Sequence, residues 1–85
     1  MPELSAPHRA VLDKLTELGA ERAPLVARRA YMRSDGRAAL DKIYVKARKL
    51  IERGVELQLL HDEMRERLGV SSAAYYKIKS GETGA

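Results

Sequence analysis

The residues best suited to bind a ligand gather near the C-terminal end, in the stretch GVSSAAYYKIKSGE at residues 69–82. The stretch holds serines, two adjacent tyrosines and two lysines, with no acidic residue between Ser71 and Lys79. Hydroxyl and ammonium groups donate hydrogen bonds, so these side chains suit a phosphate or the polar edge of a base. Alternatively, both tyrosines are partly buried and the lysines only solubilise the surface. The elements that position the stretch decide between these interpretations.

A second group of basic residues recurs at steps of 4, 3 and 4 in the middle of the chain: Lys42, Lys46, Lys49 and Arg53. On a helix this spacing forms a stripe about three turns long, which could lie along a phosphate backbone. Residues 21–53 carry 10 basic and 4 acidic residues, a balance of +6 that exceeds the formal net charge of +4 of the whole chain, because each flank is slightly acidic. The alternative is a solvated helix face, because Asp41 and Glu52 stand beside the stripe.

Other kinds of chemistry lack the residues they need. The chain has no cysteine, and His8 and His61 lie far apart without a third metal ligand beside either. Neither an activated nucleophile nor an acid–base pair of carboxylates stands at a recognisable spacing. The sequence therefore predicts a protein that is not an enzyme and that has no metal or cofactor.

The sequence also predicts a cytoplasmic protein. No apolar run approaches the roughly 20 residues that cross a bilayer. The first ten residues, MPELSAPHRA, lack the basic and apolar regions of a signal peptide.

The elements that must carry these residues are predicted to be helices, in an all-α fold. The 85 residues include 12 Ala and 11 Leu against 8 Val plus Ile, a composition that favours helices over strands. Apolar spacing and capping residues predict five helices, at residues 6–18, 24–33, 37–53, 56–68 and 71–79.

Glycines and serines set most of these predicted boundaries. We expect Gly19 and Gly54 to end the first and third helices, and a turn at Ser34-Asp35-Gly36 to end the second. Ser71 can cap the last helix. The junction at Gly54 has an alternative, because no capping residue follows it and the two helices could run together through it.

The predicted helices divide the chain into two parts within one small domain. Residues 1–36 form an N-terminal helical pair that is the candidate dimer interface. Residues 37–85 hold a long helix and the last two helices. We expect the long helix to pack across both through one apolar stripe, made of Ile43, Ala47, Leu50 and Ile51.

The segment EMRERLGVSSAAYYKI resembles the helix-turn-helix of DNA-binding regulators, in particular the LGVS turn of resolvase-like and phage-repressor-like domains. The resemblance covers residues 61–80. The family's apolar positions fall here on Met64, Leu68, Val70, Tyr75 and Ile78. Arg65 departs from the pattern, because the family usually has a small residue at this position where the second helix passes close.

The resemblance implies that the last helix reads the major groove of double-stranded DNA, as in a sequence-specific transcriptional regulator acting as a homodimer at the nucleoid. Its outward residues would then contact bases and phosphates: Ser71, Ser72, Ala73, Tyr76, Lys77 and Lys79. Such dimers usually bind paired half-sites about one helical turn apart. Two alternatives remain open: a helical protein-interaction module, such as an inhibitor or adaptor, and a non-specific nucleoid-associated protein.

Overall fold

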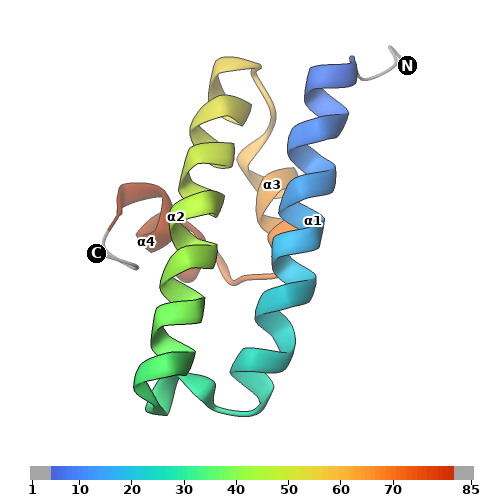
Figure 1. Cartoon of the computed structure of the whole chain (residues 1–85). Helices are drawn as coiled ribbons and strands as arrows, with labels where there is room; N and C mark the ends of the chain where they lie inside the picture. Colours follow the sequence, from blue (N-terminus) through green and yellow to red (C-terminus); the bar gives the residue numbers. More distant parts are fainter. Residues whose placement is uncertain (1–4, 82–85) are drawn as a thin grey trace.

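The computed structural model describes residues 5–81, and this part of the chain is helical without any strand. Two long helices, α1 (Ala6–Ala27) and α2 (Ser34–Glu56), run side by side in opposite directions (Figure 1). The short 3-10 turn η1 (Ala30–Met32) connects them. Two short helices, α3 (His61–Leu68) and α4 (Ser72–Ser80), pack against this hairpin. The all-α prediction is confirmed, whereas the described residues form four α-helices and not five.

The two N-terminal helices predicted before residue 34 are instead one helix. Gly19 does not end α1, which continues for two more turns and contains Pro24. Gly19 lies where the backbone of α3 approaches, and a Cβ atom at this position would be 2.6 Å from the carbonyl oxygen of Leu68. The glycine therefore permits a close approach between two helices. This role differs from ending a helix, and the local sequence does not distinguish the two.

The turn predicted at residues 34–36 is also wrong, because these residues form the first turn of α2. The extended backbone of Arg33 precedes the helix, and the Asp35 carboxylate accepts a hydrogen bond from the Gly36 amide at 2.9 Å. Gly36 is buried against the backbone of Ala30, where a Cβ atom would not fit. The segment between α1 and α2 is consequently short, and no separate α-helix forms over 24–33, which is divided between the end of α1 and η1.

Gly54 does not end α2 either. The helix runs through it to Glu56, and the side chain of Met64 occupies the space where a Cβ atom would stand, so a glycine is required here for packing. The break between α2 and α3 lies at residues 57–60, where Gln58 has a φ of 65°. The two helices are therefore separate, as the first interpretation held, but the junction lies after Gly54 and α3 begins at His61.

One cluster of buried residues joins all four helices. Leu12 and Leu15 of α1 pack with Ala47 and Ile51 of α2, and Leu68 of α3 belongs to the same cluster. Leu50, which was predicted to face the last two helices with its neighbours, is only half-buried. Its side chain lies instead beside the space between α1 and α2.

Within residues 5–81, no helix combines the length and the apolar character that crossing a membrane requires.

Candidate functional site

The turn between α3 and α4 is fixed at both ends by local hydrogen bonds. Gly69 adopts a left-handed conformation, with φ at 73°, and its amide donates to the Arg65 carbonyl at 2.9 Å. The Ser71 hydroxyl accepts a hydrogen bond from the Ala74 amide at 3.2 Å and so caps α4. The predicted cap and the predicted last helix are confirmed to within one residue.

The apolar residues on either side of this turn face the interior. Five side chains are at most 5% exposed: Met64, Leu68, Val70, Tyr75 and Ile78. These are the positions that the sequence assigned to the core. Their burial fixes which sides of α3 and α4 remain free.

Arg65, the residue that departs from the resemblance, has a structural role in the turn. Its Nη1 donates to the carbonyl oxygen of Val70 at 3.2 Å, and its Nη2 lies 4.0 Å from the Glu66 carboxylate. The side chain is 28% exposed, and its Nε is buried without a hydrogen-bond partner. A long basic residue is accommodated here because it supplies a donor to a carbonyl that lies outside the helices.

The free side of α4 presents a polar, basic surface, which we call the α4 face. Ala73, Tyr76 and Lys77 are exposed and lie at i, i+3 and i+4, so they share one side of the helix. Ser72 and Lys79 are exposed beside them, and Tyr76 is 54% exposed. With the capping residue, the α4 face comprises the following set: Ser71, Ser72, Ala73, Tyr76, Lys77 and Lys79.

An aromatic cluster that was not predicted from the sequence packs beneath the α4 face and joins α3 to α4. His61 Nδ1 lies 2.7 Å from the Tyr75 hydroxyl, which links the start of α3 to α4. The Tyr75 and Tyr76 rings meet edge to face at 5.1 Å, and the His61 ring lies 6.0 Å from that of Tyr76. Burial raises the pKa of Tyr75 to about 12, with the neighbouring Tyr76 as a smaller cause. Tyr75 therefore stays a neutral phenol, and its ring and that of His61 pack against the ring of Tyr76.

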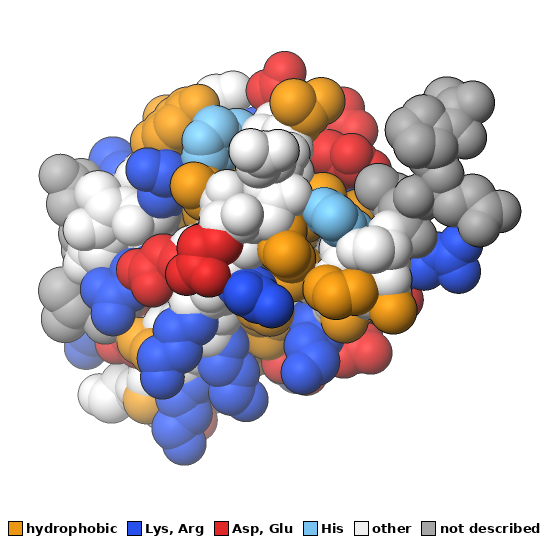
Figure 2. All heavy atoms as spheres, turned by 90° about the horizontal axis from the view of Figure 1, so that it is seen from above, with side chains coloured by type: hydrophobic (Ala, Val, Ile, Leu, Met, Phe, Trp, Pro, Cys, Tyr) orange, Lys and Arg blue, Asp and Glu red, His pale blue; other side chains and the backbone are white. Residues whose placement is uncertain are grey.

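The residues Lys42, Lys46, Lys49 and Arg53, which we call the α2 basic stripe, are all exposed. The guanidinium of Arg48 is close to Gly81, directly after α4. Lys46 is two residues from Arg48 and so points about 160° away from it around the helix axis. Basic side chains gather along one side of the molecule in Figure 2, which looks along the hairpin. The structure therefore places Lys46 on the opposite side of α2 from the end of α4.

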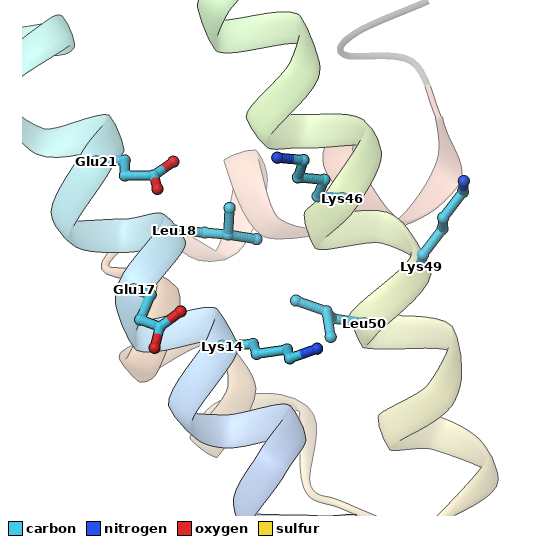
Figure 3. Close-up of a pocket in the computed structure, with 7 residues that line it drawn as sticks. All are labelled: Lys14, Glu17, Leu18, Glu21, Lys46, Lys49 and Leu50. Carbon is cyan, nitrogen blue, oxygen red and sulfur yellow. The ribbon is translucent and has the colours of Figure 1, made fainter.

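The α2 basic stripe borders a groove between α1 and α2, on the side of the hairpin away from α3 and α4 (Figure 3). The groove has a volume of about 330 Å³. Leu18 and Leu50 lie at its floor. Its edges are formed by charged residues of both helices: Lys14, Glu17 and Glu21 on α1, and Lys46 and Lys49 on α2.

Comparison of the chain with protein-family models, with curated proteins and with solved structures gives no match. Among residues 5–81, no group of three or more His, Cys, Asp or Glu side chains is placed to hold a metal ion. The candidate surfaces are therefore the α4 face and the groove between α1 and α2.

Proposed function

We propose that this protein is a sequence-specific DNA-binding regulator that places α4 in the major groove of double-stranded DNA. The observation that carries the proposal is the α4 face: an exposed side of a capped helix, with Tyr76 and Lys77 outward and no acidic residue in Ser72–Ser80. A helix with this surface fits the major groove, which admits an α-helix and attracts positive charge. Action at the nucleoid and regulation of transcription are parts of the same proposal.

Each residue of the α4 face has a role in this proposal. Lys77 donates to the acceptor atoms of guanine or to a phosphate, and Tyr76 reaches a phosphate or packs on a thymine methyl group. Ser71 and Ser72, at the start of α4, donate to phosphate oxygens where the helix N-terminus also favours negative charge. Ala73 leaves room for the helix to approach the bases.

Lys46 of the α2 basic stripe has no part in this contact, because it points away from the side of α2 that approaches the end of α4. The α4 face therefore binds DNA with few phosphate contacts. The exposed carboxylates of Asp62 and Glu66 on α3 add negative charge, which repels the phosphates. We expect affinity to depend only weakly on salt, since the slope of log K against log salt follows the number of neutralised phosphates.

Competition binding with specific and random duplexes tests the proposal. Replacing Lys77 by Ala should weaken binding to the best site by a factor of about 10–100 and should reduce the preference over random DNA. Lys46→Ala is the matched control, since it removes an equal charge on the far side of α2. If Lys77→Ala leaves the preference unchanged, or if Lys46→Ala reduces it equally, DNA recognition by the α4 face is wrong.

A second candidate function is a helical protein-interaction module, and the groove between α1 and α2 favours it. The groove lies on a side of the hairpin that neither α3 nor α4 covers, and it combines a leucine floor with charged edges. Protein interfaces often have this arrangement, with an apolar centre and a polar rim. Binding of a protein partner by a variant that has lost DNA binding would support this candidate.

A further inference from the structure

The two edges of the groove between α1 and α2 carry opposite charges over much of its length. Lys14, Glu17 and Glu21 stand on the α1 edge, and Lys46 and Lys49 stand on the α2 edge, where Lys49 is directed away from α1 (Figure 3). Lys42 and Arg53 extend the basic edge, because they belong to the same side of α2. The α1 edge is therefore acidic at Glu17 and Glu21, with Lys14 one turn before them, and the α2 edge is basic.

These charges are not consumed by ion pairs within the molecule. In residues 5–81, salt bridges within 4.0 Å join Arg53 to Glu56 and Arg65 to Glu66, and neither involves Glu17, Glu21, Lys46 or Lys49. Glu21 and Lys46 lie opposite each other across the groove in Figure 3, with the floor between them. Each edge can therefore pair with an opposite charge brought by another molecule.

We propose that a second copy of this chain packs onto the groove, related by a two-fold axis parallel to α1 and α2. Such an axis places α1 of one copy over α2 of the other at the same height along the hairpin. Glu17 and Glu21 of each copy then lie over Lys46 and Lys49 of its partner. An axis perpendicular to the helices would instead place like edges over each other, so charge selects the parallel axis.

The floor of the groove supplies the apolar contact that such a dimer needs. Leu18 and Leu50 lie side by side between the charged edges, and the hollow continues past Leu50 along Pro7, Ala10 and Val11. The assembly is a four-helix arrangement, in which the hairpins of the two copies bury the faces that each leaves open. Charged edges then fix its register.

This inference does not depend on DNA binding by α4. The groove lies on the side of the hairpin opposite α3 and α4, so the dimer leaves both α4 faces exposed and directed away from each other (Figure 3). The dimer would present its α4 faces to two separate duplexes and not to adjacent half-sites. Self-association measured without nucleic acid tests the interface alone.

Sedimentation of the full chain at low salt, with paired charge reversals, provides the test. We expect the wild-type protein to be a dimer, and we expect Glu17→Lys/Glu21→Lys and Lys46→Glu/Lys49→Glu to be monomers because each places like charges together. A mixture of the two variants should recover the dimer mass, because one variant then has two basic edges and the other two acidic edges.

The matched control is Asp13→Lys/Glu52→Lys, which changes the net charge as much as the first variant but on exposed positions outside the groove. It should remain dimeric, and circular dichroism should show that every variant keeps its helix content. A monomeric wild type, a dimer that persists in both groove variants, or a mixture that stays monomeric would each overturn the proposed interface.

Discussion

Replacement of Gly19 by alanine tests the close approach of α1 and α3, and the direction of its effect is informative. At an ordinary position in a helix, glycine to alanine stabilises by about 1 kcal/mol. Here the new Cβ would lie 2.6 Å from the Leu68 carbonyl oxygen and 2.9 Å from that of Arg67, where ordinary contacts are 3.4–4 Å. These are backbone atoms, so they cannot move aside without displacing the end of α3.

Overpacking of this kind costs about 1–3 kcal/mol, and the gain in helix propensity offsets about 1 kcal/mol of it. We therefore expect Gly19→Ala to lower the free energy of unfolding by up to about 2 kcal/mol, as measured by urea denaturation. The neighbouring exposed residue supplies the control, because Ala20→Gly should show the propensity term alone, a loss of about 1 kcal/mol. If Gly19→Ala instead stabilises the protein, the contact between α1 and α3 is wrong.

Three further predictions concern the packing beneath the α4 face. Truncation of Leu68 or Ile78 to alanine should cost about 2–5 kcal/mol in urea unfolding, since each is 1% exposed, and a loss below about 1 kcal/mol at both would contradict their burial. Ser71→Ala should cost about 1 kcal/mol through the lost cap, whereas Ser71→Asp should retain stability. Because the pKa of Tyr75 is raised from 10.0 to about 12, the folded protein keeps a proton that the unfolded chain releases, so stability should fall by about 2–3 kcal/mol as the pH rises from 10 to 12. Tyr75→Phe should lack this part of the alkaline loss, and an identical pH dependence in the two proteins would show that the phenol is not buried.

The end of α3 and the whole of α4 were predictable because these boundaries depend on local chemistry. Gly69 and Gly81 both adopt left-handed conformations after a helix, and Ser71 caps the helix that follows it. Each of these residues acts on groups within four positions along the chain. The residue that sets each boundary and the groups on which it acts therefore lie in the same short segment of sequence.

The N-terminal two thirds were harder to predict because glycine there serves a tertiary purpose. Gly19 admits the backbone of α3, and Gly54 admits the side chain of Met64. Each helix continues through its glycine, since packing against the rest of the chain outweighs a local cost of about 1 kcal/mol. A glycine that ends a helix and one that permits close approach look alike in a single sequence.

The candidate site shows the same division. Exposure of Tyr76 and Lys77 followed from the assignment of Tyr75 and Ile78 to the core, and the structure confirms that exposure. The side on which the α2 basic stripe lies depends on where α4 packs around α2, which no spacing within α2 determines. The hydrogen bond between His61 and Tyr75 likewise joins residues of two helices, so it could not be predicted from the sequence around either residue.

Selection of bound sequences from a random pool of double-stranded DNA tests recognition by α4 most directly. With the wild-type chain, we expect enrichment of a short motif of a few base pairs. The pool selected by Lys77→Ala should lose preference at one or two positions of that motif, and Lys46→Ala should select the same motif as wild type. Absence of any enriched sequence with the wild-type chain, or an unchanged motif with Lys77→Ala, would contradict recognition of DNA by the α4 face.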